Sequence, residues 1–264
     1  MDIIRVTVAA LMLILAGCND NTTLANPDSS TGELDPHQIR YVLEWDLDDI
    51  EMLLDGSIGL TTGEGHRITI HQGWLVNYSA SLVPCDYWNG TDAGSGGLRL
   101  LGIGSAHAAH GGDDDPSMTR NAVFENLLTG ETSILDEVTV TPQRYCKLHY
   151  VTAKSNLMTR DAPMDLNLEG SSLYVEGTIQ RNDEEAPEAF TIDTDLAYGI
   201  LRPLFDDVDP MASMNTEDGG IEVRIRRRLW RLFEDADLAH ENVRGVGFNM
   251  LKSLLSNTTV SIHQ

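Results

Sequence analysis

Short runs in which apolar and polar positions alternate are the clearest pattern along the chain, and they are typical of half-buried β-strands. In the strongest run, residues 74–83, Asn77 and two serines occupy one face, and the other face carries Trp74, Val76, Tyr78, Ala80 and Leu82. Residues 41–47 alternate in the same way, although a helix continuing through Leu54 fits them nearly as well. Further strands are expected at 67–71, 137–141, 145–152, 172–180, 189–194, 220–226 and 258–263. So many short strands separated by turn residues predict a mainly β fold with a β-sandwich-like domain.

Helical spacing of apolar residues occurs in three segments. One is 121–128, and the other two are 227–236 and 243–255, which lie close together before the last expected strand. We expect the latter two to form a pair of C-terminal helices that covers an open end or face of the sheets.

Residues 86–120 form a long segment with almost no periodicity. The segment is rich in glycine and contains His107 and His110, followed by the run Asp113, Asp114 and Asp115. Loops of this length are uncommon inside compact domains and are usually functional or disordered. The sequence therefore predicts a long Gly/His/Asp-rich loop.

The amino-terminal residues have the ingredients of a secretory signal. Arg5 precedes an apolar run over 6–15, which is too short to span a bilayer, since a spanning helix needs about 20 residues. The sequence Leu15-Ala16-Gly17-Cys18 resembles the lipobox of bacterial lipoproteins. This resemblance implies cleavage before Cys18, attachment of diacylglycerol to its sulfur and acylation of the new amino terminus. Because Asn19 rather than aspartate follows, the resemblance also favours the outer membrane.

Three parts of the chain are expected from these observations. Residues 1–17 are the signal peptide, 18–40 the lipidated amino terminus with a flexible tether, and 41–264 a single β-rich domain. The tether has too few large apolar residues to offset the entropy of ordering it. The membrane is then a partner through the lipid anchor, and the domain faces the periplasm or the exterior.

The chain is strongly acidic, with 41 Asp and Glu residues, 18 Lys and Arg residues and a formal net charge of −23. Such a surface repels phosphate backbones, so nucleic acid is not expected as a partner. The one basic run consists of Arg224, Arg226, Arg227, Arg228 and Arg231. We expect these arginines to form ion pairs with acidic neighbours, with contact to a lipid head group as the alternative.

After lipidation of Cys18, the cysteines Cys85 and Cys146 remain. An even pair in an oxidising compartment predicts a disulfide. Closing a loop of about 60 residues is worth about 4 kcal/mol on the chain-entropy model. The alternative is a pair of thiolates that binds a metal ion.

Candidate metal ligands are His107, His110, Asp113 and Asp114, because imidazole and carboxylate groups so close in sequence suit zinc or copper better than calcium. A solvated loop is the alternative for this stretch. His149 is a further candidate, since a disulfide at Cys146 ties the start of the loop to the same strand. On a regular strand, however, positions 146 and 149 point to opposite faces, so a structural histidine is equally compatible with the sequence.

Enzyme signatures are not found in the sequence. The G-x-S-x-G elbow, the P-loop, the dinucleotide fingerprint and the H-E-x-x-H motif all fail. We therefore expect a non-enzymatic envelope lipoprotein that binds a transition metal, zinc or copper, for storage, sensing or delivery. The alternative is a metal-free β-rich scaffold that binds another envelope protein or a glycan.

Overall fold

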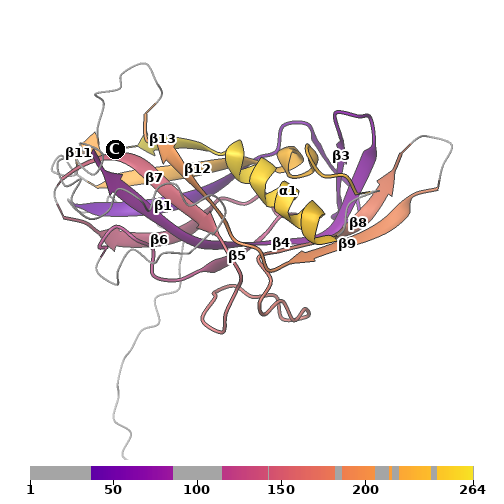
Figure 1. Ribbon diagram of the computed structural model, residues 1–264, viewed down its shortest axis with the longest axis horizontal. Coiled ribbons are helices and arrows are strands. Elements are labelled where there is room, and N and C mark those ends of the chain that lie inside the picture. Colours follow the sequence, from indigo (N-terminus) through magenta and orange to yellow (C-terminus); the bar gives the residue numbers. More distant parts are fainter. Residues whose placement is uncertain are drawn as a thin grey trace, which may run out of the picture. The chain divides into compact units, whose positions relative to one another are not determined.

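Two β-sheets contain the strands of this computed structural model, which describes residues 37–85, 115–141, 143–181, 186–205, 214–215, 220–238 and 243–263 (Figure 1). Residues 34–264 belong to one compact unit. Its main core is built from side chains of both sheets. The fold is therefore mainly β, as predicted, and its layout is that of a β-sandwich.

The smaller sheet has four strands in the order β13–β12–β1–β6. Their bounds are β1 (Gln38–Asp46), β6 (Ser133–Thr139), β12 (Ile221–Arg228) and β13 (Thr259–His263). β1 and β12 run parallel, with Ile39 opposite Ile221, and the two outer strands are antiparallel to their neighbours. The alternation over residues 41–47 thus belongs largely to a strand. The alternative prediction, a helix continuing through Leu54, is wrong.

The larger sheet has nine strands arranged around the 18-residue strand β4 (Arg67–Pro84). The others are β2 (Ile50–Met52), β3 (Ile58–Thr61), β5 (Val123–Asn126), β7 (Arg144–Thr152), β8 (Leu173–Gln180), β9 (Glu188–Thr194), β10 (Tyr198–Pro203) and β11 (Met214–Asn215). β3 and β5 pair with one edge of β4, and β8 and β7 pair with the other edge. The helix expected over 121–128 is wrong, because this backbone pairs with β4 as β5.

At two places along β4, the side chains that point toward the core change from one set of alternate residues to the other. Register shifts lie between Ile70 and Gln72 and between Asn77 and Ser79, and an extra residue exchanges the positions that face the core. Between the shifts Leu75 joins the main core, whereas Val76 joins a second cluster with Phe124 and Leu168. After the second shift the main core contains Ala80 and Leu82. The predicted single face from Trp74 to Leu82 is therefore wrong, although the strand itself is confirmed.

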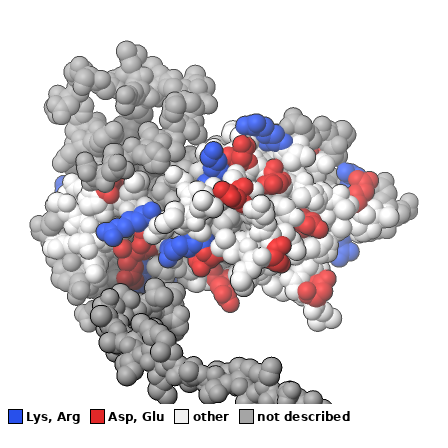
Figure 2. Space-filling model, turned by 90° about the horizontal axis from the view of Figure 1, so that it is seen from below, with Lys and Arg blue, Asp and Glu red and all other residues white. Residues whose placement is uncertain are grey.

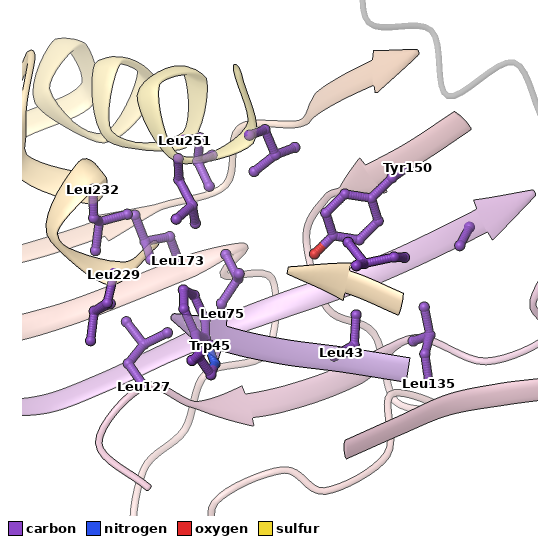
Figure 3. Packing of buried hydrophobic residues seen from close by; sticks show 14 of the residues in the cluster. Leu43, Trp45, Leu75, Leu127, Leu135, Tyr150, Leu173, Leu229, Leu232 and Leu251 are labelled. Atoms are coloured by element: carbon purple, nitrogen blue, oxygen red, sulfur yellow. The ribbon is translucent and has the colours of Figure 1, made fainter. Parts of the chain in front are cut away.

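One α-helix lies in the described residues, α1 (Val243–Ser256), and it confirms the second of the two expected C-terminal helices. The first is wrong, because β12 continues to Arg228 and only a short 3-10 helix follows, η4 (Leu229–Phe233). Leu229, Leu232 and Leu251 of these elements gather with Leu75 and Leu173 of the larger sheet in the core (Figure 3). No helix in the described ranges has the length and apolar character needed to cross a bilayer.

α1 is fixed to the sheets at both ends of its buried face. Gly247 lies against β9, where a Cβ atom would come within 2.8 Å of the Thr194 side chain. At the carboxyl end, the Arg202 guanidinium donates hydrogen bonds to the carbonyls of Leu255 and Ser256. A cation at this position satisfies carbonyls that the helix leaves unpaired and complements its dipole.

Candidate functional site

The predicted metal ligands are only partly within the described chain. His107, His110, Asp113 and Asp114 lie outside the described residues, as does the lipidation residue Cys18. The described residues contain no group of three or more His, Cys, Asp or Glu side chains that could hold a metal ion. The expected long loop over 86–120 is described only from residue 115, where Ser117 and Thr119 bond to the backbone of β4.

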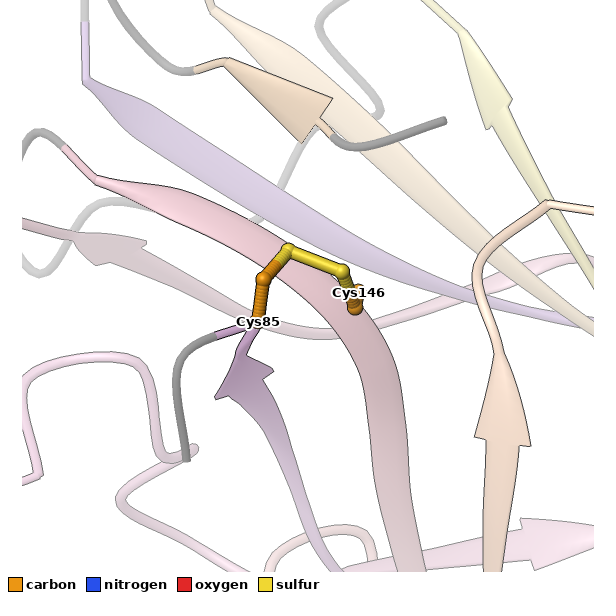
Figure 4. Close-up of a disulfide and its surroundings, with 2 residues drawn as sticks. All are labelled: Cys85 and Cys146. Atoms are coloured by element: carbon orange, nitrogen blue, oxygen red, sulfur yellow. A yellow bond between two sulfur atoms is a disulfide. The ribbon is translucent and has the colours of Figure 1, made fainter. Parts of the chain in front are cut away.

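The predicted disulfide is confirmed. Cys85, directly after β4, is bonded to Cys146 of β7, with 4.9 Å between the Cα atoms (Figure 4). Both sulfurs are used in this bond, so they do not form the thiolate pair considered as the alternative. The bond ties the start of the segment that follows Cys85 to β7, the strand that carries His149.

His149 lies on the exposed side of β7, opposite Ser81 of β4 and Leu201 of β10. Its imidazole stands over Gly199, where a Cβ atom would be 3.5 Å from Nε2. Partial loss of hydration lowers the pKa of His149, which favours the neutral imidazole that metals bind.

On a regular strand, residues 146 and 149 would point to opposite faces of the sheet, but β7 is not regular at this place. A register shift separates the pairs Val83–Lys147 and Pro84–Tyr145. As a result Tyr145 and Leu148, three residues apart, are both buried in the main core. The alternation restarts at this irregularity, so spacing alone does not separate the faces of Cys146 and His149.

The described residues form a better defined concave surface around Trp230 of η4. One cavity of about 570 Å³ lies between this ring and the β2–β3 hairpin, with Glu51 and Arg67 in its wall. A second cavity of about 580 Å³ lies between the same ring, the β3–β4 turn and residues 233–238. We call the two cavities together the Trp230 groove. They share four residues, Thr62, Gly63, Ile68 and Trp230.

Carboxylates dominate the charge of the Trp230 groove. The acidic side chains that line it are Asp49, Glu51, Glu64, Glu234, Asp235 and Asp237. His66 is held between the Glu64 carboxylate, 3.2 Å from Nε2, and the Arg181 carbonyl oxygen, 3.1 Å from Nδ1. The Arg181 guanidinium is already paired with Glu188 at 2.7 Å. The groove thus combines an aromatic ring with an excess of negative charge.

Trp230 already contacts one cation of its own chain. The Arg231 guanidinium carbon lies 3.9 Å from the centre of the indole ring, and this guanidinium is paired with Glu234. Arg231 lines neither cavity, so the part of the ring that borders the groove is open to a ligand.

A second charged cluster, around Arg227, is buried between the sheets. The fully buried guanidinium donates to both carboxylate oxygens of Glu125, at 2.5 and 2.7 Å, and to Asn77 Oδ1 at 3.0 Å. Tyr150 also donates to Asn77, and Trp45 covers the guanidinium at 4.2 Å. Burial is the largest single influence and lowers the pKa of Arg227, but the charges of Glu125 and Tyr150, together with the hydrogen bonds to both, raise the pKa above its ordinary value. We assign this cluster to joining the sheets, since its members are enclosed by the core.

Tyr150 gives the Arg227 cluster an expected pH dependence. Burial raises the pKa of Tyr150 to about 12, above the ordinary value near 10. A raised phenol pKa stabilises the fold fully below pH 10, and this contribution is lost as the pH rises from about 10 to about 12. We expect about 2 to 3 kcal/mol of unfolding free energy to be lost over this range. In Tyr150→Phe, the free energy of unfolding in urea should fall less steeply between about pH 10 and about pH 12 than in the wild type. An equally steep fall in the variant would contradict this role of Tyr150.

The basic run is paired with carboxylates throughout. Arg224 contacts Glu44 at 2.6 Å and Glu222 at 2.5 Å, Arg226 contacts Glu44 at 3.6 Å and Arg228 contacts Asp46 at 3.3 Å. Figure 2 shows basic and acidic side chains lying next to one another on the face that it presents. The expectation of ion pairs is therefore confirmed for this run.

Sequence reasoning missed both Trp230 and Arg227 as distinctive residues. Trp230 lies in the segment 227–236, for which the sequence predicts a helix. The acidic residues Glu234, Asp235 and Asp237 that follow are the signal that could have marked Trp230 as part of a binding groove. Arg227 had no such signal, because its partner Glu125 is 102 residues away.

Comparison with known proteins does not assign the chain to a family. Its sequence matches no protein-family model, and neither a curated protein nor a solved structure matches it.

Proposed function

We propose that this protein is a lipid-anchored, non-enzymatic binding protein of the bacterial envelope. In this proposal the Trp230 groove binds another envelope component, a protein or a glycan. The observation that carries it is the pair of cavities of about 570 and 580 Å³ that meet at one aromatic ring. Ligand sites have volumes of about 300–1,000 Å³ and combine aromatic walls with a few polar groups.

The cellular address in this proposal comes from the lipobox resemblance at 15–18. Lipid at Cys18 holds the protein at a membrane, with the outer membrane favoured, and the tether allows the β-rich domain to reach a partner nearby. A lipid anchor with more than one acyl chain gives stable attachment. The Trp230 groove then meets envelope components at high local concentration.

Site-specific photocrosslinking in the native bacterium tests this proposal. A photoreactive residue at Glu51 or Glu64, one in each cavity, should give an adduct with an envelope component. The same residue at Glu169, an exposed position that lines neither cavity, is the control and should give none. The groove adducts should fall at least about tenfold in a Trp230→Ala background, as expected when a central aromatic contact is removed. Equal adducts at all three positions, or none in the groove, would remove the proposal.

A second candidate function is the binding of zinc or copper for storage, sensing or delivery. The observation that favours it is the Cys85–Cys146 disulfide, because it ties the start of the segment containing His107 and His110 to the strand of His149. In this proposal Asp113 or Asp114 completes the ligand set. Neutral imidazole and carboxylate groups are ligands suited to both metals.

Isothermal titration with zinc and with copper tests the metal proposal on the purified protein. We expect binding tighter than about 10 μM, and a loss of at least about tenfold in affinity in His107→Ala/His110→Ala. His149→Ala should weaken binding as well, whereas His263→Ala, at the exposed end of β13, should not. Weaker binding than this in the wild type, or unchanged binding in the double variant, would rule the proposal out.

A further inference from the structure

We infer that the Trp230 groove recognises a basic, extended segment of a partner protein, with a Lys or Arg side chain in each cavity. This inference rests on the proposed function and names its ligand. It follows from the charge of the groove, the chemistry already present at Trp230 and the position of β2.

Charge complementarity is the first argument. Six carboxylates line the groove, and of the two guanidinium groups that also line it, Arg181 is paired with Glu188. Glu51, Asp235 and Asp237 are exposed, so a ligand can reach them without displacing core side chains. The net charge of −23 adds a field that attracts cations and raises their rate of association.

The second argument is the contact between Trp230 and Arg231. A guanidinium 3.9 Å from the ring, held by the Glu234 carboxylate, is the arrangement that a basic ligand side chain would repeat on the open part of the ring. A cation over an indole is favourable, and indole is the best of the aromatic groups for this contact. The neighbouring carboxylates supply charge-assisted hydrogen bonds to the same cation.

The third argument favours a polypeptide over a small amine. β2 is the last strand on its side of the larger sheet, where it pairs with β3 alone among the described strands. Ile50 and Glu51 of this edge strand also line the first cavity. An extended segment can hydrogen-bond to such an edge while alternate side chains enter adjacent pockets. The segment would continue from this edge along the β3–β4 turn, whose Thr62 and Gly63 line both cavities, so that one basic side chain can enter each cavity.

A synthetic peptide with lysine at alternate positions, titrated against the purified full chain by calorimetry, tests this inference. The control peptide has glutamine in place of each lysine. We expect the lysine peptide to bind at least about tenfold more tightly at about 20 mM salt, and this advantage to shrink at about 150 mM salt. Trp230→Ala should abolish most of the difference, with near-UV circular dichroism to verify its fold.

Two charge-matched double variants separate the groove from general acidity. Glu51→Gln/Asp235→Asn removes one carboxylate from each cavity and should weaken lysine-peptide binding at least about tenfold. Asp165→Asn/Glu169→Gln removes two exposed carboxylates elsewhere and should leave binding unchanged. Equal losses in both variants, or equal binding of both peptides, would overturn the inference.

Photocrosslinking separates failure of this inference from failure of the proposed function. Groove adducts with a glycan alone would overturn the basic segment and leave the binding protein intact. Groove adducts with a basic protein segment support both. The absence of groove adducts removes the proposed function and the inference together.

Discussion

Arg227→Met is expected to lower the free energy of unfolding by about 3–5 kcal/mol. The substitution leaves the Glu125 carboxylate, of which only 5% is exposed, buried without its counter-charge. It also removes one of the two donors to Asn77 Oδ1 and the cation beneath Trp45. Equilibrium unfolding in urea, followed by far-UV circular dichroism, measures the change.

Two further variants test whether the pairing causes this loss. Arg224→Met removes an arginine of the same strand that is 38% exposed, and it should change stability by less than about 1 kcal/mol. Arg227→Met/Glu125→Leu removes the whole ion pair and should recover much of the loss, because apolar replacement of a buried pair is often near neutral. A loss in Arg227→Met no larger than in Arg224→Met would show that the cluster is not what joins the sheets.

Removal of the disulfide in Cys85→Ala/Cys146→Ala is expected to lower the free energy of unfolding by about 4 kcal/mol. The bond joins residues separated by 61 positions, so it restricts a large loop in the unfolded chain. Urea unfolding under oxidising conditions gives the difference from the wild type. Each single variant should lose about as much as the double variant, because either one breaks the bond.

The wild-type protein with a reducing agent is the matched control for the disulfide. Reduction should reproduce the loss seen in the double variant, and it should have no effect on that variant itself. A loss well below about 1 kcal/mol in both experiments would show that the bond adds little to stability. The remaining role of the disulfide would then be to anchor the residues that follow Cys85 to β7.

The strands were largely predictable from sequence because a half-buried strand shows its period of two directly. β7, β8, β9 and β13 begin and end within a few residues of the expected ranges. The disulfide was predictable from the cysteine count together with the oxidising compartment that the lipobox resemblance implies. The register shifts of β4 were not, because they depend on how β7 and β8 pair with it. The shift between Asn77 and Ser79 lets Asn77, Ala80 and Leu82 all face the core, which the alternation in the sequence does not show.

Two predicted helices are wrong because contacts with residues distant in sequence determine the local structure there. Residues 121–128 have helical spacing, but pairing with β4 makes them β5. Residues 227–236 also have it, yet the contact of Arg227 with Glu125 keeps the chain extended through Arg228. The Trp230 groove was not predictable for a related reason. Its walls come from the hairpins between β2 and β4 and from residues 230–238, which are far apart in sequence.

The parallel pairing of β1 with β12 has a consequence for the order in which the protein is assembled. Glu44 of β1 and Arg224, its partner on β12, are 180 residues apart in sequence. During synthesis β1 emerges long before β12, so the centre of the smaller sheet forms only when the chain is nearly complete. Both cysteines of the Cys85–Cys146 bond precede β12 in the chain, so this bond can close earlier. The topology thus makes the smaller sheet the last part of the fold to be completed, after every strand of the larger sheet has been made.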